Sequence, residues 1–328
     1  MRYLVTGATG FLGGHLIAAL AERGEKVVAL GRDPNKCAAL QRAGIETVQC
    51  DLCDRPAVEA ALKGLEIVFH VAALTAPWGP YRDFHAANVT ATENVAHAAL
   101  LNGVRRLIFV SSPSVTSSRR DGTETDESEP YAKRYMSPYP LTKKLAEDAV
   151  NRIRDQIELV IVRPKAIFGP GDLSLLPRLV AASRRGVLRQ IGNGSNLVDL
   201  TYVANVVDAL LLAAHSSRAV GSTYLITNGE HVLLWPVLRK VLAAAGCDPN
   251  LRTIAAPVAY AAATLMEWKS RWTHKEPAMS RYAVSVLERT QIYSIEAARR
   301  DLNYIPKVSV EQGLDLTMPW LREYSEKV

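Results

Sequence analysis

The sequence predicts an α/β fold, a doubly wound parallel sheet followed by a smaller C-terminal lobe. In the first half, short β-rich runs alternate with helical stretches, and their continuous apolar character is typical of parallel strands buried on both faces. A glycine-rich turn joins the first run to the first helix. Beyond about residue 170 the pattern changes to helices with brief strands. We therefore predict a first lobe over residues 1–170 and a second over residues 171–328, with some segments of the second returning to the sheet.

The elements of the first lobe follow from these runs in chain order. Strands are expected at residues 3–7, 26–31, 45–50, 66–73, 106–112 and 157–164. Helices are expected at residues 15–24, 88–103 and 139–153. The first helix ends at Gly24, where a left-handed cap suits glycine. Residues 117–130 are polar and lack apolar periodicity, so we expect a solvated loop there.

The second lobe is expected to be mainly helical. Helical stretches at 176–186 and 233–246 are separated by short strand-like runs at 197–203 and 223–229. Ser309 and Gln312 stand in capping-box positions and predict the start of a last helix. The longest uncharged apolar run, residues 255–266, is shorter than the roughly 18 residues that a bilayer span requires.

Composition describes an ordinary globular chain. With 328 residues, of which 48% are hydrophobic and 22% charged, it can bury a large core. The net charge is +6, but Lys and Arg are scattered and no basic run is interleaved with aromatics, so we expect no nucleic-acid partner. The four cysteines form no disulfide framework, which fits a reducing compartment. A strand begins directly after Met1, which leaves no room for a leader ahead of the fold, and we expect a cytoplasmic protein.

The turn TGATGFLG, residues 6–13, carries glycines at 7, 10 and 13 between the first strand and the first helix. Glycine permits the tight turn and lets the backbone approach a pyrophosphate, which the helix N-terminus attracts. This is the arrangement of a Rossmann fold. The first lobe is therefore predicted to bind a dinucleotide, and the second is predicted to bind mainly the substrate.

The end of the second strand predicts the choice of dinucleotide. Arg32 stands where an NAD-selective site usually places a carboxylate on the ribose 2′-hydroxyl, and its guanidinium could pair with a 2′-phosphate. NADP(H) is therefore favoured, with NAD(H) as the alternative because Asp33 lies next to Arg32. After the third strand, Asp51 and Leu52 could edge the adenine, and small residues follow the fourth strand in HVAA, residues 70–73.

YPLTKK, residues 139–144, places Lys143 one helical turn after Tyr139. A positive neighbour favours phenolate and lowers a tyrosine pKa from about 10 toward the range of acid/base catalysis. Spacing alone leaves two interpretations, a proton donor or an aromatic at a helix start.

These segments together resemble the extended short-chain dehydrogenase/reductase superfamily. The resemblance rests on the GxxGxxG spacing, HVAA, Asn88 in ANVTATENV, VSSPSV and YPLTKK. SSPSV with SPYPLTKKLAEDAV is similar to the 3β-hydroxysteroid dehydrogenase group. The 2-alkyl-3-oxoalkanoate reductases of long-chain olefin biosynthesis are the most similar in pattern, through PWGPYRDFHAANV, GPGDLSLLPRL, IGNGSNLVDLTYV, EPAMSRY and ARRDLNYIPKVSVEQGL.

The resemblance implies roles for particular residues. Ser112 would hydrogen-bond the substrate carbonyl, Tyr139 would deliver the proton, and Lys143 would hold the nicotinamide ribose and depress the phenol pKa. Cofactor contacts are expected from the glycine turn, the strand ends and the catalytic helix: Gly7, Thr9, Gly10, Phe11, Leu12, Gly13, Arg32, Asp51, Leu52, Ala72, Ala73, Asn88, Ser111, Tyr139, Lys143, Pro164, Ala166 and Ile167. No metal site is expected, because the CxxC of Cys50 and Cys53 has no second ligand pair.

The substrate is expected to be a lipid-like ketone or alcohol. Nucleotide-sugar epimerases of the superfamily usually carry Asn where this chain has Ala166 and Arg where it has Val198. The loss of this amide donor and this cation disfavours a diphosphate substrate. Aromatic and apolar residues replace them, with Trp78 and Tyr81 as pocket candidates. For a 3-oxo acid, Lys165 or Arg178 would bind the carboxylate.

Several alternatives stay open at this point. The favoured reaction is reduction of the 3-keto group of a long-chain 2-alkyl-3-oxo acid, and the nearest rival is oxidation of a 3β-hydroxysteroid or 4-carboxysterol. A nucleotide-sugar epimerase or reductase and a non-catalytic NADP redox sensor are further alternatives.

A homodimer is expected through helices within residues 85–102 and 139–154, with alanines 91, 96 and 98 permitting close packing. Residues 255–275 either cover the substrate pocket or contact a membrane surface, through Trp268, Lys269, Arg271, Trp272 and Lys275.

Overall fold

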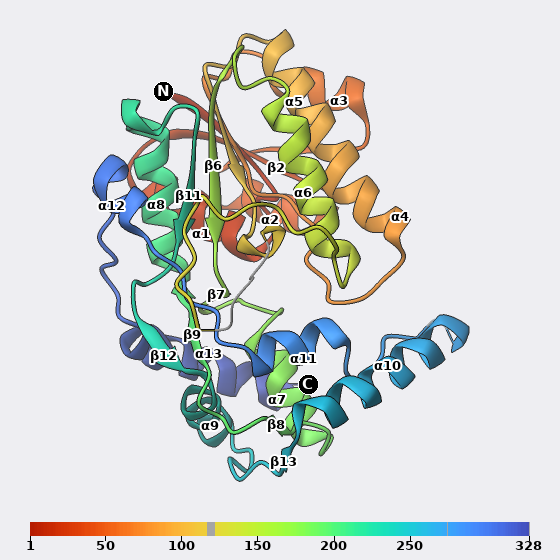
Figure 1. Ribbon diagram of the computed structural model, residues 1–328. Coiled ribbons are helices and arrows are strands. Elements are labelled where there is room, and N and C mark those ends of the chain that lie inside the picture. The colour runs from red at the N-terminus through yellow and green to blue at the C-terminus, as the bar shows by residue number, and fades with distance from the viewer. Residues whose placement is uncertain (117–121, 274, 328) are drawn as a thin grey trace.

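The computed structural model describes residues 1–116, 122–273 and 275–327 and contains a central seven-stranded sheet (Figure 1). Its order is β11-β6-β5-β4-β1-β2-β3. The strands are β1 (Arg2–Thr6), β2 (Lys26–Gly31), β3 (Glu46–Gln49), β4 (Ile67–His70), β5 (Arg106–Val110), β6 (Glu158–Pro164) and β11 (Ser222–Ile226). Every neighbouring pair is parallel, which confirms the predicted doubly wound sheet. β11 comes from the second half of the chain and lies at the edge of the sheet, beside β6.

Helices cover both faces of this sheet because its strands are apolar on both sides. One face packs against α1 (Phe11–Glu22), α2 (Pro34–Arg42) and α8 (Val203–His215). The other packs against α3 (Arg55–Ala61), α5 (Ala91–Leu101) and α6 (Pro138–Asn151), which lie together in Figure 1. Successive side chains of β1 point to opposite faces of the sheet, so Tyr3 and Val5 belong to the core on the first face and Leu4 to the core on the second.

The remaining elements of the described chain form the second half and the connections. Short strand pairs join β7 (Ile167–Phe168) to β10 (Thr201–Tyr202), β8 (Gln190–Ile191) to β13 (Thr253–Ile254), and β9 (Leu197–Asp199) to β12 (His231–Leu233). The helices are α4 (Tyr81–Phe84), a π-helix (His85–Thr90), α7 (Leu176–Arg184), α9 (Leu234–Ala244), α10 (Ala256–Thr273), α11 (Arg281–Glu288), α12 (Glu296–Leu302) and α13 (Val310–Lys327), with short 3₁₀ turns at Pro113–Val115 and Ser217–Ala219.

Two local predictions are confirmed. Gly24 has a φ of +71° after α1, as a left-handed cap requires. Before α13, the Ser309 backbone N–H donates to Gln312 Oε1 at 3.0 Å and the Gln312 N–H donates to Ser309 Oγ at 3.1 Å, which closes the capping box. In the part of the chain that the structure describes, no helix is long and apolar enough to cross a membrane.

The polar segment is a mostly exposed loop over the described residues 122–130, as predicted, and residues 117–121 lie outside the described part. Within it, Thr125 pairs with Tyr293 and Glu127 accepts the Leu225 backbone N–H at 2.8 Å. One expectation needs correction. The alanines at 91, 96 and 98 are 2%, 3% and 0% exposed within the protomer, so they pack on its own core and offer no dimer face. The homodimer and the division of the chain at residue 170 stay predictions.

Candidate active site

A cavity of about 2490 Å³ lies at the carboxyl edge of the sheet, between the sheet and the second half of the chain. Small-molecule pockets usually have volumes of about 300–1,000 Å³, so this one has room for a dinucleotide together with a large substrate. The ends of β1, β2, β4, β5 and β6 all contribute to its wall. This is the edge at which open parallel sheets bind ligands.

The glycine turn fits a closely approaching pyrophosphate. Gly7 has a φ of +67°, and a Cβ there would lie 2.8 Å from the Ala72 Cα. A Cβ on Gly13 would lie 2.1 Å from the Gly7 carbonyl oxygen, so only glycine lets the helix begin this close to the strand. Gly10 is the N-cap residue of α1 and has no side chain that could occupy the first N–H groups of the helix, and the first turn has no acidic residue. The first N–H groups of α1 are therefore available to an anion.

A buried hydrogen-bond network holds the loop after β4 against this turn. The His70 ring lies between Thr6 Oγ1 at 2.8 Å and Thr92 Oγ1 at 2.9 Å. Burial lowers the pKa of His70 to about 3, so the ring is neutral at physiological pH. Thr6 Oγ1 also accepts the backbone N–H groups of Val71 and Ala72, at 3.1 and 3.2 Å. The loop that carries Ala72 and Ala73 is thereby fixed beside Gly7.

The end of β2 presents cations to the cavity. Arg32 and Lys36 line it, and neither has an ion-pair partner within residues 1–116, 122–273 or 275–327. Asp33 caps α2, where its Oδ1 accepts the backbone N–H groups of Asn35 at 2.9 Å and Lys36 at 3.1 Å. The Asp33 carboxylate is thus engaged by its own helix. Asp51 and Leu52, after β3, also line the cavity.

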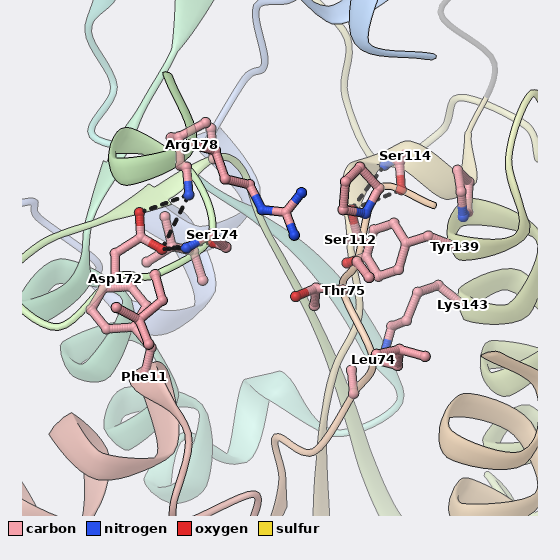
Figure 2. Close-up of a pocket in the computed structure, with 18 of the residues that line it drawn as sticks. Phe11, Leu74, Thr75, Ser112, Ser114, Tyr139, Lys143, Asp172, Ser174 and Arg178 are labelled. Carbon is pink, nitrogen blue, oxygen red and sulfur yellow. Dashed lines mark hydrogen bonds between the residues drawn. The ribbon is translucent and has the colours of Figure 1, made fainter. Parts of the chain in front are cut away.

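Ser112 and Tyr139 lie together on one wall, as Figure 2 shows. Ser112 ends the β5 segment and caps the 3₁₀ turn Pro113–Val115, with its Oγ 2.9 Å from Ser114 Oγ. The Ser112 side chain also lies beside the Tyr139 phenol and lowers its pKa, but burial raises that pKa more. Ser111 Oγ, next to them, is buried without a hydrogen-bond partner among the described atoms. A phenol with a raised pKa keeps its proton at neutral pH and can donate it.

Lys143 lies one turn along α6 and is almost fully buried, at 1% exposure. Its Nζ donates to the Val110 carbonyl oxygen at 2.7 Å and lies 4.2 Å from the centre of the Phe109 ring. Burial lowers the pKa of Lys143 to about 7, against an opposing effect of Glu147. The expectation that Lys143 depresses the pKa of Tyr139 is wrong for this state of the protein. Burial raises that pKa, the opposing effect comes from Ser112 and not from Lys143, and the Lys143 ammonium donates to the strand carbonyl.

Asn88 lies in the π-helix behind this wall and not in the cavity lining. Its side chain accepts the Leu74 N–H at 2.7 Å and donates to the Leu74 carbonyl at 3.2 Å and to Thr142 Oγ1 at 3.0 Å. π-Helical turns often occur at functional sites, because the extra residue redirects a side chain. Asn88 therefore links the loop after β4 to the helix that carries Tyr139 and Lys143.

The segment after β6 has a strained backbone at Ala166, whose φ is +42°. This left-handed conformation costs a non-glycine residue roughly 1–2 kcal/mol. Hydrogen bonds maintain it: the Lys165 N–H donates to the Ile226 carbonyl at 3.0 Å, and the Thr201 N–H donates to the Ala166 carbonyl at 3.2 Å. Strain of this kind often accompanies functional sites. Pro164, Lys165, Ala166 and Ile167 all line the cavity.

Lys165 lies in a second cluster of polar residues on the cavity wall. Its Nζ donates to Gln291 Oε1 and lies 5.4 Å from the centre of the Tyr293 ring. Burial lowers the pKa of Lys165 to about 8, although Asp199 acts in the opposite direction. Asp199 is completely buried, accepts the Tyr293 backbone N–H at 2.7 Å and lies 2.7 Å from His231 Nδ1.

Arg178 extends into the cavity from the wall opposite Ser112 and Tyr139 (Figure 2). It pairs with Glu276 at 2.8 Å, and both side chains are about half exposed, at 46% and 50%. The nearby Asp172 lies in the turn before α7, where it accepts the backbone N–H groups of Ser174 at 2.7 Å and Leu175 at 3.1 Å, so its carboxylate serves the local turn.

The structure brings most of the predicted site residues to one cavity. All the predicted cofactor and catalytic residues line it except Asn88, and so do Trp78, Lys165 and Arg178. Tyr81 does not; it lies on α4 and is 47% exposed. No residue of α10 is among the lining residues that the structure describes, so the interpretation of this helix as a cover over the pocket is wrong.

Sequence reasoning missed the tyrosines of the second half. Tyr282, from α11, lies near Ser114 and Tyr139, and burial raises its pKa. Tyr293 and Gln291 line the cavity beside Lys165. No local pattern marks these residues, since they approach Ser112 only after the second half folds onto the sheet edge.

Comparisons with known proteins agree with this geometry. Residues 4–256 match the model of the 3-beta hydroxysteroid dehydrogenase/isomerase family. The chain is 39% identical to a 2-alkyl-3-oxoalkanoate reductase of Stenotrophomonas maltophilia, over 96% of this chain and 97% of that one. It is 31% identical to the decarboxylating sterol-4-alpha-carboxylate 3-dehydrogenase ERG26 of Saccharomyces cerevisiae, over 98% and 97%.

Solved structures share the fold along the full chain. The crystal structure of gox2253 has a TM-score of 0.82 at 28% identity and covers 98% of both chains. MoeE5 in complex with UDP-glucuronic acid and NAD has a TM-score of 0.75 at 25% identity, over 99% of this chain and 100% of that one.

Proposed function

The chain belongs to the 3-beta hydroxysteroid dehydrogenase/isomerase family and is a nicotinamide-dependent oxidoreductase, and from this premise we propose that it reduces the 3-keto group of a long-chain 2-alkyl-3-oxo acid with NADPH. The observation that carries the proposal is the joint placement of Ser112, Tyr139 and Lys143 on one wall of a cavity with a dinucleotide-type glycine turn. The choice of substrate is supported by full-length similarity to a reductase with that name.

In the proposed reaction the bound nicotinamide supplies a hydride to the carbonyl carbon. Ser112 Oγ donates a hydrogen bond to the carbonyl oxygen, which polarises the double bond. The Tyr139 O–H gives its proton to the same oxygen, and a hydroxyl group results. Burial raises the pKa of Tyr139, so the phenol is protonated before the reaction and has a proton to give. The phenolate that remains would be stabilised by the Ser112 hydroxyl, and Lys143 would hold the nicotinamide ribose.

Selection of NADP(H) is proposed to depend on Arg32, with Lys36 adding a second cation. Both line the cavity without an ion-pair partner in the described chain, whereas Asp33, the competing carboxylate, caps α2. Arg32→Glu should raise the KM for NADPH by about 10–100-fold, the equivalent of a lost charge-assisted hydrogen bond, and change the KM for NADH far less. Asp33→Ala is the matched control; it should lower stability by about 1 kcal/mol through the lost cap but leave the NADPH/NADH preference unchanged.

The substrate carboxylate is proposed to bind Lys165 rather than Arg178. Arg178 already pairs with Glu276 and is half exposed, so an added carboxylate gains little there. The Lys165 ammonium donates to a neutral amide of Gln291, and burial lowers its pKa, so an anion would stabilise its charged form. Lys165→Met should raise the KM for a 3-oxo acid and leave that for a ketone without a carboxylate unchanged. An equal effect on both substrates, or the larger effect from Arg178→Met, would contradict this assignment.

The first experiment follows NADPH oxidation by absorbance with a synthetic 2-alkyl-3-oxo acid. The wild type should turn over, and Tyr139→Phe and Ser112→Ala should lose about 10²–10⁴-fold in kcat, the usual contribution of a proton donor or of an oxyanion-type hydrogen bond. Unchanged activity of Tyr139→Phe would refute its role as the donor.

Sterol oxidation is the second candidate, because the chain is also 31% identical to a sterol-4-alpha-carboxylate dehydrogenase. NAD⁺ reduction with a 3β-hydroxysterol, without turnover of the oxo acid, would favour it. Protection from thermal unfolding by a UDP-sugar would instead indicate a nucleotide-sugar substrate. If Tyr139→Phe had no biological effect, a redox sensor without catalysis would be favoured.

A further inference from the structure

Helix α10 (Ala256–Thr273) projects from the body of the protein (Figure 1). Its buried residues form a single stripe, Ala259, Ala263, Glu267 and Ser270. Glu267 ties this stripe to the start of α11, because it accepts from the Arg281 backbone N–H at 2.7 Å and from Arg281 Nε at 2.8 Å. The inner face of α10 is therefore fully used in holding the helix to the protein.

The outer face is apolar and has no partner in the part of the chain that the structure describes. Val258, Leu265, Trp268 and Trp272 are 61%, 69%, 61% and 75% exposed. With 3.6 residues per turn, these positions and Ala261 fall on one stripe, opposite the buried one. The two indole rings meet edge to face, with centroids 6.1 Å apart. Clustered, exposed tryptophans on a projecting helix are atypical of a surface that faces only water.

Cations surround the tryptophan end of this stripe. Lys269, Arg271 and Lys275 are exposed, and none of them has a hydrogen-bond or ion-pair partner for its side chain among the described residues. The acidic groups nearby are engaged, since Glu267 is buried with Arg281 and Glu276 pairs with Arg178. The local surface is thus apolar in its centre and positive at its margins.

We propose that the outer face of α10 docks on the surface of an anionic lipid bilayer. Tryptophan prefers the membrane–water interface, where the ring lies among acyl chains and the N–H reaches polar headgroups. Lysine and arginine beside such a face attract anionic lipids. A helix with one apolar face and one face held by the protein lies in the interface and does not span the bilayer.

A second copy of the chain is the competing occupant, and charge disfavours it. Residues 258, 261, 265, 268 and 272 follow the spacing of a helix–helix seam, so a partner helix could in principle pack there. The positions that flank this seam are Ala262, Thr264, Lys269 and Arg271. A second α10 would offer the two cations no carboxylate, whereas anionic headgroups would neutralise them.

A segment shortly after α10 forms part of the cavity wall. Glu276, Pro277, Ala278 and Met279 begin three residues after the end of α10, and all four line the cavity, as does Tyr282 on α11. Docking would hold this wall beside the bilayer surface, where a long-chain substrate is concentrated. That consequence rests on the proposed function, whereas the docking itself does not.

The test is flotation of the full chain with vesicles of phosphatidylglycerol and phosphatidylcholine, without substrate. The wild type should float with these vesicles, and much less at high salt or with phosphatidylcholine alone. Trp268→Ser with Trp272→Ser, and separately Lys269→Glu with Arg271→Glu, should each reduce the bound fraction at least about tenfold. Reduction of a short, water-soluble ketone should be unchanged in both variants, which separates loss of docking from loss of fold.

Two matched controls alter the same chemistry elsewhere on the surface. Ile305→Ser with Leu316→Ser removes two exposed apolar side chains, which are 73% and 56% exposed. Lys26→Glu with Lys63→Glu makes the same change of net charge at two exposed lysines of the sheet lobe. Both controls should float as the wild type does. The proposal would be overturned if the wild type did not float, or if the control variants lost as much binding as the α10 variants. It would also be overturned, in favour of a second copy, if no vesicle binding were seen and the tryptophan variant had half the mass of the wild type in sedimentation.

Discussion

Lys143 should make the free energy of unfolding rise with pH above neutrality. Its Nζ is buried, with a backbone carbonyl and an aromatic ring as neighbours, and burial lowers its pKa from 10.5 to about 7. In the unfolded chain a lysine keeps its proton up to about pH 10. Between about pH 7 and 8.5 the unfolded state therefore binds more protons than the folded state, and stability rises with pH.

The magnitude follows from this difference in bound protons. One proton of difference is worth about 1.4 kcal/mol per pH unit, and the difference grows from about half a proton at pH 7 to nearly one at pH 8.5, so Lys143 should add about 1.6 kcal/mol over this window. Lys165, whose pKa burial lowers to about 8, adds a smaller rise of the same sign. At higher pH the sign reverses for Cys50, whose pKa burial raises to about 11, and this limits the window.

Urea unfolding of the wild type and Lys143→Met at four pH values in this window measures the effect. The variant should lose about two-thirds of the rise and retain the part that Lys165 supplies. Lys144→Met is the matched control; Lys144 pairs with Asp148 at 2.6 Å, and its loss should leave the slope unchanged. Parallel pH profiles for the wild type and Lys143→Met would refute the account of a buried, proton-releasing lysine.

Three further predictions concern other residues of the first half of the chain. Gly13→Ala places a Cβ 2.1 Å from a backbone oxygen and should abolish cofactor binding in calorimetry, whereas Gly14→Ala, whose nearest contact is an ordinary 3.8 Å, should preserve it and stabilise α1 by up to about 1 kcal/mol. Asn88→Ala removes three hydrogen bonds of a buried side chain and should cost about 2–4 kcal/mol in urea unfolding, together with weaker cofactor binding; an effect on stability alone would leave Asn88 without a positioning role. Glu147→Gln leaves the buried guanidinium of Arg163 without its carboxylate and should cost about 3–5 kcal/mol, which a second substitution, Arg163→Met, should largely restore.

The sheet and the glycine turn could be predicted because each depends on local sequence. Strands such as RLIFV, which forms β5, are continuous apolar runs, and Gly7 and Gly13 occur at positions where a Cβ would clash with neighbouring backbone. Tyr139 and Lys143 could be paired because a helix fixes their separation. These features need no knowledge of distant contacts.

The rest of the site depends on tertiary contacts that no short window contains. Gln291 and Tyr293 meet Lys165 across more than a hundred residues of chain. The direction of the Lys143 ammonium is set by the position of the Val110 carbonyl on a neighbouring strand, so the expected effect on the Tyr139 pKa was wrong. For α10, composition suggested a pocket cover, and only the burial pattern revealed which face is free.

The most direct test of the central claim is transfer of deuterium from NADPH that carries deuterium at C4 of the nicotinamide. The purified protein is incubated with this cofactor and a long-chain 2-alkyl-3-oxo acid, and the product is analysed by mass spectrometry. We predict a 2-alkyl-3-hydroxy acid with one deuterium on C3, formed from one face of the nicotinamide and absent with Tyr139→Phe. A substrate recovered unreduced, or a hydroxy acid without deuterium at C3, would contradict the account.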